Sequence, residues 1–128
     1  MSDEGHLVCN HTRDHTDLTK LSAERIREQI LGGAGVGSCN LLRPPYGAHN
    51  AYVDSIAAEL GYAIEMWDID TRDWARRYAG GDQEILNIVL SQAYPSAVVL
   101  MHMHVDNTVY ALPAMLQGLK DAGYEFHW

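Results

Sequence analysis

The stretch Leu7-Val-Cys-Asn-His11-Thr-Arg-Asp-His15 contains the pattern that decides the fold of this chain. A short apolar run at Leu7–Asn10, of the kind that forms a buried strand, leads directly to a histidine. The same order of an apolar run and then a chemically active side chain recurs further along the sequence. The later strands are predicted at Asn40–Leu42, Tyr62–Ile69 and Ala97–Met101, and they lead to Arg43, Asp70 and His102.

Amphipathic helical patterns separate these predicted strands. Helices are predicted over Ala23–Leu31, Ala51–Leu60 and Gln83–Ala93, with a last helix between Asn107 and Gly123 and a closing strand at Tyr124–Phe126. The expected N-cap residues of the first three helices are Ser22, Asn50 and Asp82. Strands that alternate with helices are typical of an α/β fold with a parallel sheet. Because parallel strands of a barrel end on one face, the side chains that follow them should meet in a single active site.

The composition limits the classes of partner that this chain can have. Its 128 residues suffice for one domain with one core. The net charge of −8 argues against nucleic acid or an anionic membrane surface as a partner, since both need a basic face. No apolar run is long enough to span a membrane, and the segment that begins at Met1 does not read as a signal peptide.

Cys9 and Cys39 are the two cysteines of the chain. They are compatible with free thiols or with one bridge, and their number and spacing favour free buried thiols.

His11 and His15 are candidate ligands for a divalent metal ion. Their spacing predicts that both imidazoles lie on one side of a helical turn. Two histidines and a carboxylate would suit zinc, with cobalt or nickel as alternatives. Taken alone, the spacing is more typical of a solvated polar loop than of a ligand pair.

Four motifs, taken together, resemble a known family. In order, they are His11-Thr-Arg-Asp-His15, Arg43-Pro-Pro-Tyr-Gly47, Asp70-Thr-Arg-Asp73-Trp74 and Val98-Val-Leu-Met-His102. This set resembles motifs two to five of the polysaccharide deacetylases, carbohydrate esterase family 4, and the resemblance extends from about Gly5 to Phe126. It implies an α/β fold, an incomplete (β/α) barrel that lacks the first strand. Residues 1–128 would then form a single truncated catalytic domain.

The resemblance also implies a role for each matching residue. His11 and His15 would bind the metal, and Arg43 would hold the aspartate that acts as catalytic base. The backbone N–H of Tyr46 would help to bind the oxyanion, while Trp74 and Leu100 would contribute to substrate binding. Asp73 would orient His102 as the general acid. His104 competes for that last role, but His102 matches the family's Leu-x-His pattern and is preferred.

The family's first motif supplies a third metal ligand and the base, both aspartates, and it is absent before His11. The acids Asp3 and Glu4 stand in that region, and no catalytic role is carried over to them. A missing first strand would also leave an open sheet edge, which favours a homodimer or poor solubility.

The resemblance implies a metal-dependent hydrolase that removes N- or O-acetyl groups from chitin oligomers, peptidoglycan or xylan. The alternatives are a catalytically silent remnant that binds carbohydrate or metal, and a hydrolase whose missing carboxylates come from another chain. Relatives of this kind act mostly outside the cytoplasm, so the resemblance implies an extracellular or cell-wall location.

Overall fold

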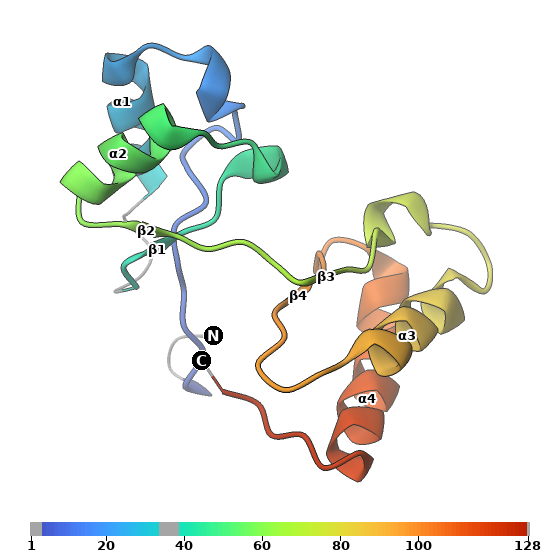
Figure 1. Cartoon of the computed structure of the whole chain (residues 1–128). Helices are drawn as coiled ribbons and strands as arrows, with labels where there is room; N and C mark the ends of the chain where they lie inside the picture. The colour runs from blue at the N-terminus through green and yellow to red at the C-terminus, as the bar shows by residue number, and fades with distance from the viewer. Residues whose placement is uncertain (1–3, 34–38, 128) are drawn as a thin grey trace. The chain divides into compact units, whose positions relative to one another are not determined.

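A computed structural model describes residues 4–33 and 39–127 of the chain (Figure 1). The chain divides into two compact units, residues 1–66 and residues 67–128. The first unit contains α1 (Ala23–Gly33), β1 (Leu41–Leu42), α2 (Ala51–Glu59) and β2 (Ala63–Ile64), with short 3-10 helices at Leu18–Lys20 and Pro45–Gly47. The second contains β3 (Ile69–Asp70), a 3-10 helix at Asp73–Ala75, α3 (Gly81–Gln92), β4 (Val99–Leu100) and α4 (Asp106–Asp121). The prediction of a single domain stays a prediction.

The strands form two short parallel pairs, which agrees with the predicted α/β class. In the first unit β1 pairs with β2, and in the second β3 pairs with β4. The prediction of one continuous strand over Tyr62–Ile69 is wrong, because the two ends of that run pair with different strands. Tyr124–Phe126 is not a strand either.

The run Leu7–Asn10 forms a single parallel bridge in place of the predicted strand. Asn10 is opposite Leu42, its N–H donates to the carbonyl of Leu41, and its carbonyl accepts from the N–H of Arg43. This one bridge places His11 beside the end of β1.

The first unit is held together by apolar side chains from α1, α2, β1 and the 3-10 helix at Leu18–Lys20. The buried set is Leu18, Ile26, Ile30, Leu42, Val53, Ile56 and Ala57. The predicted caps of both helices are present: the Ser22 hydroxyl accepts from the N–H of Arg25 at 3.4 Å, and the Asn50 side chain accepts from the N–H of Val53 at 2.9 Å.

In the second unit α3 packs against α4 through Ile85, Val89, Ala111 and Met115. Asp82 is not the N-cap of α3, so that prediction is wrong. The helix begins two residues earlier than predicted, at Gly81, and its N-cap is Gly80, whose φ of 90° suits glycine. Gly81 then sits close to Asn107 and the carbonyl of Arg76, where no larger side chain would fit.

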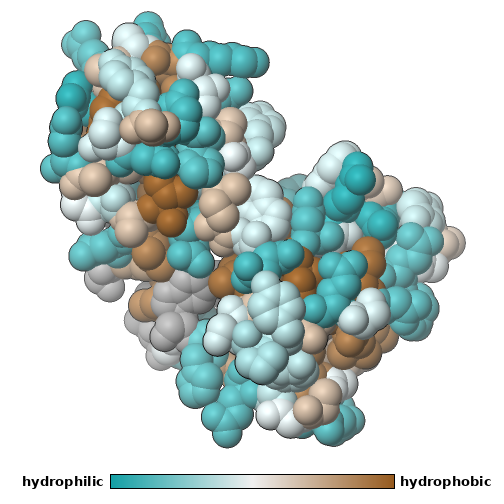
Figure 2. Space-filling model, in the orientation of Figure 1, coloured by the Kyte–Doolittle hydropathy of each residue, from teal (hydrophilic) through white to brown (hydrophobic). Residues whose placement is uncertain are grey.

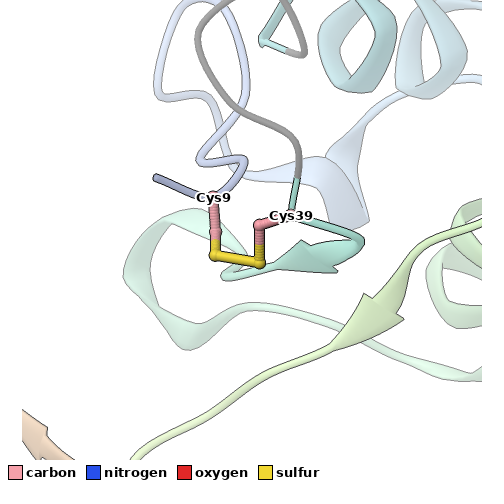
Figure 3. The surroundings of a disulfide bond; sticks show 2 residues. All are labelled: Cys9 and Cys39. Carbon is pink, nitrogen blue, oxygen red and sulfur yellow. A yellow bond between two sulfur atoms is a disulfide. The ribbon is translucent and has the colours of Figure 1, made fainter. Parts of the chain in front are cut away.

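Cys9 and Cys39 form a disulfide, with their Cα atoms 4.8 Å apart (Figure 3). The preference for free thiols is therefore wrong. The bridge at Asn10 holds the segment of Cys9 alongside the segment that enters β1, so the two sulfur atoms meet although 30 residues separate them.

On the face shown in Figure 2, hydrophilic side chains predominate and hydrophobic residues gather in smaller patches. Several large apolar side chains are nevertheless exposed, among them Leu7, Tyr46, Trp74, Met103 and Tyr110. Within the described ranges, no helix has both the length and the apolar character needed to cross a membrane. The predicted homodimer stays a prediction.

Candidate active site

The two predicted metal ligands, His11 and His15, lie side by side in the first unit. Their ring centroids are 4.8 Å apart, edge to face. The segment that carries them is a bent loop and not the helical turn that the spacing predicted, because Thr12 (φ 66°) and His15 (φ 55°) adopt left-handed backbone conformations. The rings thus meet through loop geometry and not through helical periodicity.

Asn10, a residue that the sequence did not single out, anchors one end of this loop. Its side chain is only 4% exposed. The amide nitrogen donates to the carbonyl of Ile30 at 2.8 Å, and the amide oxygen accepts from the N–H of Thr12 at 2.8 Å. In the sequence, the available signal for this anchoring role is the position of Asn10 between an apolar run and a histidine.

Gln29 of α1 anchors the middle of the same loop, and its role was also missed. Its carbonyl accepts from the N–H of Arg13. Its side-chain oxygen accepts from the N–H of Asp14 at 2.9 Å, and its side-chain nitrogen donates to the Asp14 carboxylate at 2.7 Å. Because Gln29 is buried, these bonds hold the histidine loop against the end of α1.

The orientation of His11 is fixed by the arginine turn. Its Nδ1 lies 2.6 Å from the backbone carbonyl of Arg43. A carbonyl only accepts, so Nδ1 carries the proton in this contact and Nε2 is the basic nitrogen of the neutral ring. Histidine ligands of metals characteristically donate their other ring nitrogen to a carbonyl in this way.

His11 and His15 therefore fit two positions of a zinc-type site. Within residues 4–33 and 39–127, no group of three histidine, cysteine, aspartate or glutamate side chains could hold a metal ion. Asp3 lies outside the described residues.

Arg43 lies at the end of β1 and is partly buried. Burial lowers the pKa of its guanidinium from the usual value. Among the described residues, no carboxylate forms an ion pair with it. A cation in this position is suited to a carboxylate or another anion.

Tyr46 follows in the turn Pro45–Gly47 with a left-handed φ of 61°. Its exposed ring lies against His15, with centroids 4.7 Å apart. The hydrogen bonds of the turn come from the N–H groups of Gly47 and Ala48, and no acceptor for the N–H of Tyr46 is seen in the described part of the chain. That N–H is thus available to an incoming oxygen.

In the second unit, Asp73 and His102 form a hydrogen-bonded pair. Asp73 is 1% exposed, and its Oδ1 lies 2.8 Å from Nδ1 of His102. Three further donors reach the carboxylate: the N–H of His102 at 2.5 Å, the N–H of Trp74 at 2.9 Å and the hydroxyl of Thr108 at 2.7 Å. Burial by itself raises the pKa of Asp73, but the hydrogen bonds from His102 and Thr108 and the charge of His102 outweigh it, so the pKa is lowered.

An ionised Asp73 makes Nδ1 of His102 the donor, and Nε2 is left as the nitrogen that can exchange a proton with a substrate. The side chain of His102 is 27% exposed, so solvent reaches it. The His104 ring lies 5.5 Å from the His102 ring but has no carboxylate partner in the described residues. The geometry therefore favours His102 over His104 as the proton donor.

Trp74 and Leu100, the predicted substrate contacts in this unit, differ in accessibility. The Trp74 ring is exposed, and the guanidinium carbon of Arg72 lies 5.5 Å from its centroid. Leu100 is buried in β4, and its carbonyl accepts from the hydroxyl of Thr71 at 2.8 Å. Its position makes Leu100 a core residue of this unit, whereas the Trp74 ring is open to solvent.

The predicted site residues thus form two groups, each brought together within its own unit. The first contains His11, His15, Arg43 and Tyr46, and the second contains Asp73, Trp74, Leu100 and His102. The prediction that both groups meet at one rim of a sheet stays a prediction.

Comparison with known proteins connects both groups to one family. Residues 1–64 match the family model described as polysaccharide deacetylase. The chain is 40% identical over 131 residues to the peptidoglycan-N-acetylglucosamine deacetylase PgdA of Listeria monocytogenes, and the match covers 97% of this chain. It spans only 27% of that relative's length.

Solved structures give the same result for the fold. A family 4 carbohydrate esterase from Streptomyces lividans, in complex with acetate, matches with a TM-score of 0.85 and 33% identity, over 95% of this chain and 65% of that chain. A CE4 family pseudoenzyme from Bacillus anthracis matches with a TM-score of 0.85 and 30% identity, over 97% of this chain and 45% of that chain. The predicted fold class is confirmed by these likenesses.

Proposed function

The chain belongs to the polysaccharide deacetylase family, and we propose that it acts in a hydrolase that removes acetyl groups from a polysaccharide. In this proposal, the chain supplies the general acid and the metal-binding histidines of that hydrolase. The substrate class that we favour is a polymer of N-acetylglucosamine, as in peptidoglycan or chitin oligomers. Support comes from the 40% identity to the Listeria peptidoglycan-N-acetylglucosamine deacetylase. O-acetylated xylan is the less favoured substrate.

The observation that carries the proposal is the buried Asp73 carboxylate hydrogen-bonded to His102. In the hydrolysis, water gives a proton to the catalytic base as it adds to the acetyl carbonyl carbon, and the bond from that carbon to nitrogen then breaks. The leaving nitrogen takes a proton from Nε2 of His102, and the products are acetate and a free amine. Before this proton transfer, Asp73 stabilises the protonated imidazole of His102.

The residues of the first unit would act on the carbonyl side of the reaction. A divalent metal, with zinc preferred over cobalt and nickel, would polarise the acetyl carbonyl and lower the pKa of the attacking water. His11 and His15 would hold that metal, and the N–H of Tyr46 would donate to the oxygen that becomes negative. Arg43 would hold the carboxylate of the catalytic base, which is not among the described residues.

A location outside the cytoplasm is part of the proposal. The Cys9–Cys39 disulfide supports it, because such bonds persist in oxidising compartments and are rare in the cytosol. The net charge of −8 agrees with a neutral or basic saccharide partner and not with nucleic acid.

Acetate release from an N-acetylglucosamine oligomer, measured with and without added zinc, tests the function. We expect zinc-dependent release in the wild type that is abolished by His11→Ala and strongly reduced by His102→Ala. His104→Ala is the matched control, and its effect should be small if His102 is the acid. Release that is equal in wild type and His102→Ala would contradict the proposal.

A second candidate is a protein that binds carbohydrate or metal without turnover. Two observations favour it: no group of three metal-ligand side chains lies among the described residues, and a CE4 family pseudoenzyme has a similar fold. Zinc binding by calorimetry that depends on His11 and His15, together with no acetate release, would support this candidate over the enzyme.

A further inference from the structure

We propose that Thr108 is a positioning residue for the Asp73–His102 pair, acting through the hydrogen bond between its hydroxyl and the Asp73 carboxylate. The inference rests on the proposed function only for its effect on catalysis, since the contact itself lies wholly within the second unit. Nothing in the four motifs singles out Thr108, which stands in the first turn of α4.

The direction of this hydrogen bond is unambiguous. Thr108 Oγ1 lies 2.7 Å from Oδ2 of Asp73, and both residues are buried, Thr108 with 0% exposure. A carboxylate accepts, so the threonine hydroxyl donates. A buried hydroxyl that donates to a charged acceptor forms one of the stronger classes of hydrogen bond.

Four donors together fill the acceptor positions of the Asp73 carboxylate. Oδ1 accepts from Nδ1 of His102 and the N–H of Trp74, and Oδ2 accepts from the N–H of His102 and the hydroxyl of Thr108. With two bonds on each oxygen, the carboxylate cannot rotate without losing several of them. Because its plane is fixed, the direction of the His102 ring is fixed too, and so is the position of Nε2.

Thr108 is itself held rigidly, which a positioning role requires. Its N–H donates to the carbonyl of Val105 at the start of α4. The neighbouring Asn107 side chain donates to the carbonyls of Arg76 and Tyr78, so the first turn of α4 is tied to the segment that follows Asp73. The N-terminal end of a helix also favours a nearby negative charge.

His102 is the titratable side chain that faces the Asp73 carboxylate in the described residues. The other donors, from Trp74 and Thr108, carry no charge. Loss of the Thr108 hydroxyl should therefore act on the ionisation of Asp73, and the His102 imidazole is the charge beside the carboxylate that remains.

Thr108→Val and Thr108→Ser test the proposal, with Thr71→Val as the matched control. Valine keeps the shape and removes the hydroxyl, and serine keeps the hydroxyl. Thr71 is also fully buried in this unit and donates its hydroxyl at 2.8 Å, but to the carbonyl of Leu100 and not to Asp73. The readouts are the titration of the Asp73 carboxyl by carbon NMR and, separately, the pH profile of acetate release.

We expect Thr108→Val to raise the pKa of Asp73, because an ionised carboxylate loses a donor. In the active protein, the acidic limb of kcat should move to higher pH and kcat should fall about tenfold, while KM changes little. Thr108→Ser should titrate like the wild type, and Thr71→Val should leave the Asp73 titration unchanged.

An unaltered Asp73 titration in a folded Thr108→Val protein overturns the proposal. So does a Thr108→Ser protein that titrates differently from the wild type, and this second variant decides the question if the valine protein does not fold. The NMR readout needs no turnover. An inactive wild type would therefore refute the proposed function. The NMR titration of Asp73 would still test the role of Thr108 in that case.

Discussion

Replacing both cysteines of the Cys9–Cys39 disulfide with serine should destabilise the first unit strongly. The bond closes a loop across a sequence separation of 30 residues. A cross-link restricts the unfolded chain, and for a loop of this length the lost chain entropy corresponds to about 3.6 kcal/mol at 25 °C. That is a large fraction of the roughly 5–15 kcal/mol by which domains are stable.

Urea denaturation followed by circular dichroism measures this free energy, and hydrogen exchange of the amides in α1 and α2 assigns it to the first unit. The Cys9→Ser/Cys39→Ser variant and the reduced wild type should lose similar amounts. Reductant added to the double variant is the control and should have no further effect. A double variant as stable as the oxidised wild type would refute the reasoning.

The same substitution should also weaken zinc binding. Cys9 precedes Asn10, whose backbone bridge to β1 and side-chain bond to Ile30 place His11. Loosening this segment makes the histidine loop mobile, and part of the binding free energy must then order it. Calorimetry with zinc should show lower affinity in the double variant than in the oxidised wild type.

Two further predictions follow from close contacts and from charge. In Gly33→Ala the new Cβ would lie 2.8 Å from backbone atoms of Thr12 and closer still to the Asn10 side chain. We therefore expect the free energy of unfolding, measured by thermal denaturation, to fall by about 1–3 kcal/mol. Zinc binding should weaken as well, because the histidine loop must shift. Gly32→Ala is the control, because the atoms nearest to its Cβ belong to the Arg13 side chain and not to the backbone. Equal losses in both variants would contradict this reading. The pKa of Asp73 is lowered on folding, so its contribution to stability is present above the ordinary carboxyl pKa and is lost as the pH falls through the lowered value. Urea midpoints measured from about pH 6 down to about pH 2 should fall in the wild type and be flatter in Asp73→Asn; parallel curves would count against this role of Asp73.

The helices and their order could be predicted from the sequence. Amphipathic repeats such as Ile26 with Ile30, and Ile85 with Val89, place apolar side chains on one face of a helix, and a helix forms from neighbours in the sequence. The caps at Ser22 and Asn50 are equally local. The motif residues were recognised for the same reason, since each motif is a short continuous stretch.

Only the tertiary structure decided which distant groups meet. The disulfide joins residues 30 positions apart in the sequence. The hydrogen bond from the Asn10 side chain to the Ile30 carbonyl spans 20 positions, and that from the Thr108 hydroxyl to Asp73 spans 35. The type of a residue shows whether it can donate or accept a hydrogen bond. Which partner it bonds to depends on how the chain packs. The conformation of the histidine loop was missed for this reason: long-range bonds from α1, and not the spacing of His11 and His15, place the two rings together.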